Sequence, residues 1–274
     1  MNQRTVFYVS DQTGVTSETL GHSLMTQFEG VAVRQVTLPF VSTRNKAREA
    51  VEAINAMGRD DGVRPIVFST LVQDDVRAII ADSQAFVLDF FDSFLGPLER
   101  ELGAESSHTS GRAHGMTDTW KYDRRIEATN FALSNDDGAN TREYERADLV
   151  LVGVSRSGKT PTCLYLALQY GIFAANFPLT EEEFEGRGMS PALRDHHDKL
   201  YGLTIDPERL QQISRSRRPD SQYASHRQIG FEVRQAEALF TKHGIPYVDA
   251  THMSIEEIAS RILHTTGLER RVLP

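Results

Sequence analysis

The sequence predicts an α/β fold made of two α/β halves with mainly parallel sheets. Short runs of β-branched and aromatic residues alternate with longer segments in which apolar residues recur every three or four positions. This alternation is typical of β-α-β units, in which helices cover both faces of a parallel sheet. A stretch rich in glycine, serine and polar residues interrupts the pattern between about residues 103 and 119 and separates the two halves.

The N-terminal half alternates strands with helices. The expected strands are Val6–Val9, Val31–Leu38, Ile66–Ser69 and Ala85–Leu88, and the last two have the apolar composition of buried strands. The expected helices are Ser17–Phe28, Thr43–Met57 and, approximately, Val72–Ala81. In the first helix Leu20, Leu24 and Phe28 lie four positions apart, so they share one face. We expect an N-terminal α/β domain over residues 1–105.

The C-terminal half resumes the same alternation. The expected strands are Ala147–Gly153, Ile172–Asn176, Leu200–Ile205 and Pro246–Asp249. The expected helices are Tyr122–Leu133, Lys159–Tyr170, Pro207–Ser214, Arg227–His243 and Ile255–His264, with a turn at Asn135–Gly138. We expect a linker or mobile loop over residues 106–120 and a nucleotide-binding domain over residues 121–274.

Composition excludes several classes of protein. The formal net charge of −8 makes nucleic acid or an anionic membrane a poor main partner. Cys163 is the single cysteine, which excludes an intrachain disulfide and a cysteine-based metal cluster. No run of about 18 apolar residues occurs, and the first residues lack the apolar core of a signal peptide. We therefore expect a cytoplasmic protein.

The strongest motif is a glycine-rich segment, called here the glycine loop. It reads Gly153-Val154-Ser155-Arg156-Ser157-Gly158-Lys159-Thr160 and matches G-x-x-x-x-G-K-[ST], the phosphate loop (P-loop), at every fixed position. An expected strand precedes it and an expected helix follows it, which is the context that the motif requires. Glycines let the backbone approach an anion, and the N–H groups at a helix start bind phosphate oxygens. Lys159 would add a positive charge for a β- or γ-phosphate, and Thr160 a hydroxyl for Mg²⁺.

A kinase also needs acidic groups for a metal ion and for the acceptor hydroxyl. Asp136 and Asp137 are candidates, because two adjacent carboxylates could bind Mg²⁺ or accept a proton. From the residues alone, however, ordinary turn chemistry is the favoured interpretation of Asp136-Asp137-Gly138.

The other candidates each have a structural interpretation as well. Asp206 stands where it would begin a helix, and Asp89 ends a strand in the other half. The segment Ser10–Glu18 follows the first strand, where open parallel sheets place ligands, so it could bind phosphate or a protein. It could equally be a capped loop in which Thr16 or Ser17 starts the next helix.

Blocks of residues spread over nearly the whole chain resemble one known family. The blocks are Ser10–Ser23, Arg125–Ala128 followed by Asp136–Gly138, Gly153–Thr162, Tyr201–Leu210, Ser221–Ser225 and Ser254–Ala259. A phosphate loop alone is unspecific, but these blocks in this order are similar to the phosphoenolpyruvate synthase regulatory proteins. The resemblance extends from Val6 to about Leu268.

The resemblance implies a bifunctional enzyme. Members of this family inactivate phosphoenolpyruvate synthase by phosphorylating a threonine with ADP as the donor. They reactivate it with inorganic phosphate, which takes the phosphoryl group and leaves as pyrophosphate. A sister family acts in the same way on pyruvate, phosphate dikinase, and the segments Asp11–Gly14 and Ser221–Gln228 favour the synthase branch.

The resemblance also bears on the site residues. It implies that ADP binds Gly153–Thr160, with Mg²⁺ as an expected ion, and it raises Asp136 and Asp137 above the turn interpretation without choosing the base. We expect a homodimer whose protein substrate is phosphoenolpyruvate synthase. An ATP-dependent P-loop kinase of a small molecule and a nucleotide-binding module without catalysis remain as alternatives.

Overall fold

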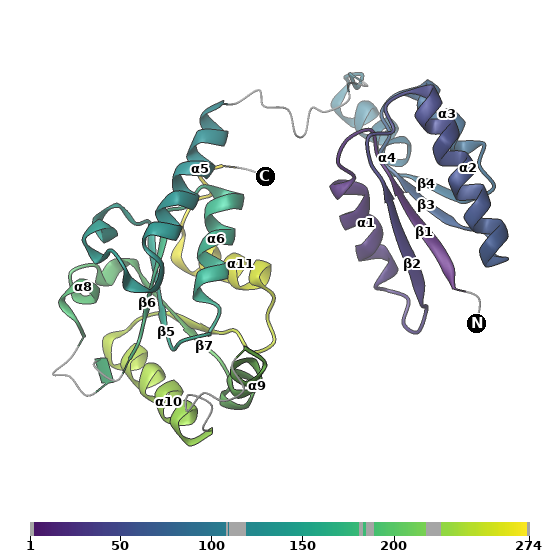
Figure 1. Cartoon of the computed structure of the whole chain (residues 1–274). Helices are drawn as coiled ribbons and strands as arrows, with labels where there is room; N and C mark the ends of the chain where they lie inside the picture. Colours follow the sequence, from purple (N-terminus) through teal and green to yellow (C-terminus); the bar gives the residue numbers. More distant parts are fainter. Residues whose placement is uncertain are drawn as a thin grey trace. The chain divides into compact units, whose positions relative to one another are not determined.

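The chain folds into two compact units, Met1–Gly115 and Met116–Pro274. The computed structural model describes residues 3–107, 109, 119–180, 183–184, 189–217 and 226–272. Each unit contains a four-stranded sheet in which all paired strands are parallel (Figure 1). The predicted α/β fold with two halves is therefore confirmed. The predicted linker at 106–120 lies largely outside the described residues.

The N-terminal unit follows the predicted order of strands and helices and adds one helix. Its elements are β1 Arg4–Val9, α1 Val15–Met25, β2 Val33–Leu38, α2 Arg44–Asp61, β3 Ile66–Ser69, α3 Asp74–Ala81, β4 Phe86–Asp89 and α4 Phe90–Leu102. The strand order is β2-β1-β3-β4. Alternate residues of β1 enter different cores: Phe7 and Val9 pack with α2 and α3, whereas Val6 and Tyr8 pack with residues of α1 and α4.

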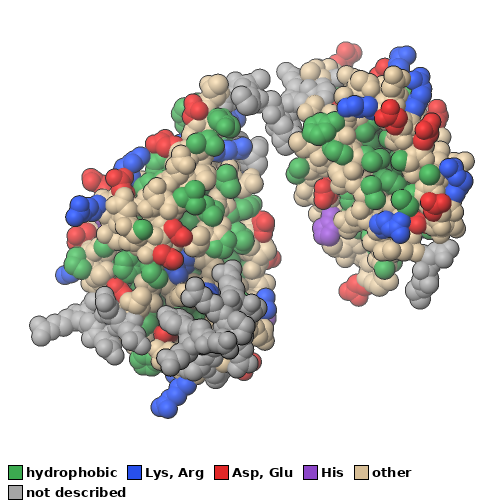
Figure 2. Space-filling view, in the orientation of Figure 1, with side chains coloured by type: hydrophobic (Ala, Val, Ile, Leu, Met, Phe, Trp, Pro, Cys, Tyr) green, Lys and Arg blue, Asp and Glu red, His purple; other side chains and the backbone are tan. Residues whose placement is uncertain are grey.

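Helix α1 does not bury the apolar face that its spacing suggests. Leu20 and Leu24 are 44% and 47% exposed, whereas the buried residues of α1 are Ser17 and Gly21. The helix ends at Met25, before the predicted end at Phe28, which is 61% exposed. The reason lies in the sheet, where the large rings of Tyr8 and Phe68 occupy the space in front of the helix. Only a small residue fits there, so the large apolar side chains point away. Hydrophobic side chains accordingly reach the surface of this unit (Figure 2).

Gly21 gives a direct test of this packing. A Cβ at position 21 would lie 2.6 Å from ring atoms of both Tyr8 and Phe68. We expect Gly21→Ala to lower the free energy of unfolding by about 1–3 kcal/mol, the usual cost of overpacking. Gly96 is the matched control, because it also lies in a helix of this unit and its added Cβ would meet only the Arg100 guanidinium, at 3.7 Å. Gly96→Ala should be neutral or stabilising. Equal stability of the two variants in urea unfolding would contradict this packing.

The predicted strand at Ala85–Leu88 forms as β4, but it is not a buried strand. Phe86 and Leu88 share one face of the strand and are 48% and 36% exposed, and β4 is an edge strand that pairs only with β3. Helix α4 follows without a loop, and the Asp89 carboxylate caps it by accepting a hydrogen bond from the N–H of Asp92 at 2.8 Å. The sequence pattern did not predict α4, which contains Pro97.

The C-terminal unit has the same strand order in its own sheet, β6-β5-β7-β8. Its elements are α5 Thr119–Ser134, the 3₁₀ turns η1 Asp136–Gly138 and η2 Thr141–Arg146, β5 Leu149–Gly153, α6 Lys159–Tyr170, β6 Ala174–Pro178, α8 Pro191–Arg194, η3 His197–Lys199, β7 Leu200–Thr204, α9 Pro207–Arg217, α10 His226–His243, β8 Tyr247–Asp249 and α11 Ile255–Thr266. Helix α6 lies against α5 and α11, while α10 packs on β7 and α9 (Figure 1). All residues of β5 and β7 are buried, as the apolar sequences of central strands require.

No described helix has both the length and the hydropathy needed to cross a bilayer.

Candidate functional site

The glycine loop connects β5 to α6 at the carboxyl end of the C-terminal sheet. Strand β5 pairs with β6 on one side and with β7 on the other, so the chain changes direction around it. Open α/β sheets bind ligands at such a point, beyond the carboxyl ends of the strands. The predicted strand, loop and helix are thus all present, and α6 begins at Lys159 as predicted.

The backbone of the loop requires both of its glycines. A Cβ on Gly153 would lie 2.3 Å from the carbonyl oxygen of Leu203 on β7, so no other residue fits there. Gly158 is the N-cap of α6 and has a φ of 98°, in the left-handed region that glycine adopts without strain. No side chain caps α6, so the N–H groups and the positive dipole end of this helix remain available to an anion.

The side chain of Lys159 points back into the glycine loop. Its side chain is almost completely buried, with the residue 4% exposed, and its Nζ donates a hydrogen bond to the carbonyl oxygen of Val154 at 2.8 Å. Burial lowers the pKa of Lys159 to about 8, while the negative charges of Asp137 and Asp136 act in the opposite direction. A phosphate group next to this ammonium would favour the charged form further.

The structure brings Asp136 to the glycine loop. The hydroxyl of Thr160 donates a hydrogen bond to Asp136 Oδ1 at 2.8 Å, although the two residues are 24 positions apart. Asp136 and Asp137 do form a tight turn, η1, in which Asp137 has a left-handed φ of 48°. The turn and site interpretations are therefore compatible, because the turn itself carries the carboxylates to the start of α6.

Two polar atoms of the loop are buried and have no partner within the described part of the chain. They are Oγ of Ser157 and Nη1 of Arg156. Buried polar groups in folded proteins nearly always have a hydrogen-bond partner, so each such atom needs an explanation. A hydroxyl and a guanidinium are both donors to phosphate oxygens. An anion held by the loop would satisfy them.

Sequence reasoning missed Asn176, the residue that connects the aspartates to the sheet. It lies in β6, is fully buried, and donates a hydrogen bond from Nδ2 to Asp136 Oδ1. Its Oδ1 accepts a hydrogen bond from the backbone N–H of Asp137 at 3.1 Å, and its backbone carbonyl accepts one from the hydroxyl of Tyr144 at 3.0 Å. The signal was present in the sequence, since an amide inside an apolar strand must find polar partners.

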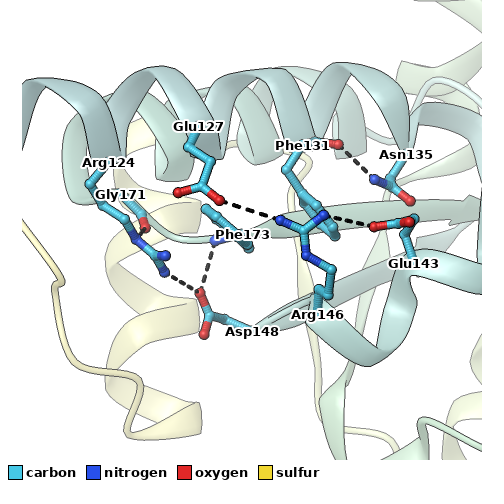
Figure 3. Close-up of polar contacts among 9 residues, drawn as sticks. All are labelled: Arg124, Glu127, Phe131, Asn135, Glu143, Arg146, Asp148, Gly171 and Phe173. Atoms are coloured by element: carbon cyan, nitrogen blue, oxygen red, sulfur yellow. Dashed lines mark hydrogen bonds and ion pairs between the residues drawn. The ribbon is translucent and has the colours of Figure 1, made fainter.

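A polar network on one side of the unit holds α5, which leads into the aspartate turn (Figure 3). The guanidinium of Arg124 lies 4.0 Å from the ring centroid of Phe173 and pairs with Asp148 at 3.6 Å. Arg146 pairs with Glu127 on α5 and with Glu143 on η2. At the end of α5, Asn135 Nδ2 donates to the carbonyl of Phe131 at 2.9 Å. The turn that carries Asp136 therefore starts from an anchored helix.

The remaining sequence candidates belong to other elements. Asp206 caps α9 by accepting hydrogen bonds from the N–H groups of Glu208 and Arg209, so its interpretation as a helix start is confirmed. Asp89 belongs to the N-terminal unit and accepts a hydrogen bond from Ser69 at 2.6 Å. One of the two interpretations of Ser10–Glu18, in which Thr16 or Ser17 caps the next helix, is wrong. Gly14 is the N-cap of α1, and the Ser17 hydroxyl instead donates to its carbonyl at 2.8 Å. The described residues contain no group of three or more His, Cys, Asp or Glu residues that could hold a metal ion.

Comparison with known proteins points to one family. The sequence profile named Kinase/pyrophosphorylase matches residues 6–263. A protein of Alcanivorax borkumensis is 54% identical over 270 residues, which is 98% of this chain and 99% of that protein. Proteins of Pseudomonas putida and Stutzerimonas stutzeri are each 53% identical over the same shares of the two chains. All three relatives bear the name "Putative phosphoenolpyruvate synthase regulatory protein". The chain belongs to the kinase/pyrophosphorylase family.

Proposed function

We propose that the protein is a cytoplasmic regulator that phosphorylates a threonine of phosphoenolpyruvate synthase with ADP and removes that phosphoryl group with inorganic phosphate. The observation that carries this proposal is the contact between Thr160 and Asp136, which places an acidic group at the lysine end of a glycine loop. A loop that merely connected a strand to a helix would need neither the buried lysine nor this carboxylate. The target is proposed from the names of the relatives and from the sequence resemblance.

The phosphates of ADP would lie against the start of α6. The N–H groups of the loop, Lys159 and the unpartnered atoms of Ser157 and Arg156 would neutralise and orient the β-phosphate. Positioning and charge neutralisation supply most of the catalysis in phosphoryl transfer. The site offers both.

The two aspartates would have different roles. Asp136 is engaged by Thr160 and Asn176, whereas the exposed side chain of Asp137 has no hydrogen bond among the described residues. We propose that Asp137 accepts the proton of the target hydroxyl. In the forward reaction the threonine oxygen bonds to the β-phosphorus, the bond to the α-phosphate oxygen breaks, and AMP leaves. In the reverse reaction an oxygen of inorganic phosphate attacks phosphothreonine, and pyrophosphate leaves as the threonine oxygen regains a proton.

Mg²⁺ is part of the proposal, with Thr160 and Asp136 as the residues that would hold it. Both present hard oxygen atoms, and these atoms already meet at 2.8 Å. Proteins typically bind Mg²⁺ through one or two carboxylates together with substrate phosphates, which fits this small donor set. When bound, the ion would neutralise charge on the phosphates.

Radiolabel transfer tests the proposal. The protein is incubated with Mg²⁺, purified phosphoenolpyruvate synthase and ADP labelled on its β-phosphorus. Pyruvate, phosphate dikinase and labelled ATP are run in parallel. We expect label on a threonine of the synthase and its release as pyrophosphate when inorganic phosphate is added. Label on the dikinase alone would keep the chemistry and change the target, whereas intact ADP binding without any transfer would indicate a non-catalytic module.

A further inference from the structure

We infer that Asn176 is a positioning residue that sets both aspartates against the start of α6. The inference rests on the proposed function, because it assigns a role to a side chain that touches no substrate. It depends on four contacts that Asn176 makes, each to a different part of the candidate site or its support.

The contacts of Asn176 bind the aspartate turn to the sheet. Its backbone N–H donates to the carbonyl of Asn135 at 3.3 Å, which fixes the residue just before the turn. Its amide then donates to Asp136 and accepts from the N–H of Asp137. One residue of β6 therefore holds consecutive residues of the turn, and no other described side chain forms hydrogen bonds with both aspartates.

Both ends of the amide are needed. Asp136 Oδ1 accepts hydrogen bonds from Asn176 and from Thr160, so the amide fixes the carboxylate oxygen that faces α6. Asp137 holds a left-handed φ of 48°, which is unfavourable for a residue with a Cβ. Its N–H bond to Asn176 restrains that conformation and hence the direction of its carboxylate. A side chain with only a donor or only an acceptor could orient one aspartate but not both.

The support of Asn176 is rigid. The residue is fully buried, and the Tyr144 hydroxyl donates to its carbonyl. Beside it, Cys163 donates to the carbonyl of Ala175 at 3.4 Å. Burial raises the pKa of both Tyr144 and Cys163, so both remain protonated donors at neutral pH. Catalytic groups held by locked side chains keep the geometry that fast transfer requires.

Two substitutions at position 176 separate positioning from simple loss of structure. Asn176→Ala removes both side-chain hydrogen bonds, whereas Asn176→Asp keeps an acceptor for Asp137 and loses the donor to Asp136. Thr204→Val is the matched control, since Thr204 is a buried residue of the same sheet whose hydroxyl donates to Glu237 on α10 at 2.8 Å instead of to an aspartate of the turn. For each protein we would measure the rate of transfer, the affinity for ADP with and without Mg²⁺, and the melting temperature.

We expect both Asn176 variants to transfer phosphate about a hundredfold more slowly than the wild type, the usual penalty for a catalytic group displaced by about 1 Å. Their affinity for ADP without Mg²⁺ should stay within about threefold of the wild-type value, because the loop is intact. Mg²⁺ should strengthen ADP binding less in the variants than in the wild type. Thr204→Val should lower the melting temperature but leave the rate per folded molecule and the Mg²⁺ effect unchanged.

The outcomes that would contradict the role of Asn176 differ from those that would contradict the proposed function. Wild-type transfer rates in both Asn176 variants, or losses that match those of Thr204→Val, would overturn the positioning role while leaving the function intact. A wild-type protein that binds ADP without transferring phosphate would defeat the proposed function. In that case the effect of Mg²⁺ on ADP binding would still test the role of Asn176. If Mg²⁺ strengthened ADP binding equally in the wild type and in both Asn176 variants, the positioning role would be refuted.

Discussion

Lys159→Ala should reduce phosphoryl transfer by about a thousandfold or more, in both the forward and the reverse direction. Removal of one preorganised electrostatic donor at a reacting centre commonly costs about 10²–10³ in rate, and Lys159 carries a full charge in a buried site. The variant should remain folded, because the deletion removes a charge whose burial is unfavourable. Transfer kinetics and thermal unfolding measured on the same sample would check both parts.

Lys199→Ala is the matched control for this substitution. Lys199 belongs to the same unit and donates to the carbonyl oxygens of Tyr144 and Glu145, away from the glycine loop. Its removal should lower stability slightly and leave the rate per folded molecule near that of the wild type. If Lys159→Ala retained full transfer activity, the glycine loop would not be the phosphate site.

Asp137→Asn should lower the rate of transfer by about 10²–10⁴, the range expected when a general base is lost. The amide has nearly the shape of the carboxylate but cannot accept the proton of the target hydroxyl. ADP affinity should change little, because Asp137 acts on the acceptor and not on the nucleotide. Transfer rate and ADP affinity measured together would separate these two effects.

Asp136→Asn should give a different pattern, since Asp136 is bonded to Thr160. We expect the rate of transfer to fall, and we expect Mg²⁺ to strengthen ADP binding less than it does in the wild type. Asp195→Asn provides a control, because Asp195 is an exposed aspartate of the same unit beyond the end of α8. If Asp136→Asn alone abolished transfer and Asp137→Asn were silent, the assignments of the two carboxylates would be reversed.

Much of the fold could be predicted because local sequence and tertiary environment agree. Strand β3 has the predicted bounds, and α6 runs from Lys159 to Tyr170 as predicted, since each is a clear apolar or amphipathic pattern bounded by polar and glycine residues. Helix α1 shows where the two disagree. The sequence spacing marks Leu20, Leu24 and Phe28 as one helical face. The helix ends at Met25, however, and the rings of Tyr8 and Phe68 exclude large side chains from its sheet side.

The sequence by itself determined the glycine loop of this protein, because the loop is a continuous segment whose glycines, lysine and threonine act at fixed short spacings. It also named Asp136 and Asp137 but could not place them. Only the tertiary structure decided that Asp136 meets Thr160, since that contact depends on how α5 ends and where β6 pairs with β5. The role of Asn176 was decided in the same way. A hydrogen bond between residues 40 positions apart has no local pattern, and it exists only once strand pairing has brought the two segments together.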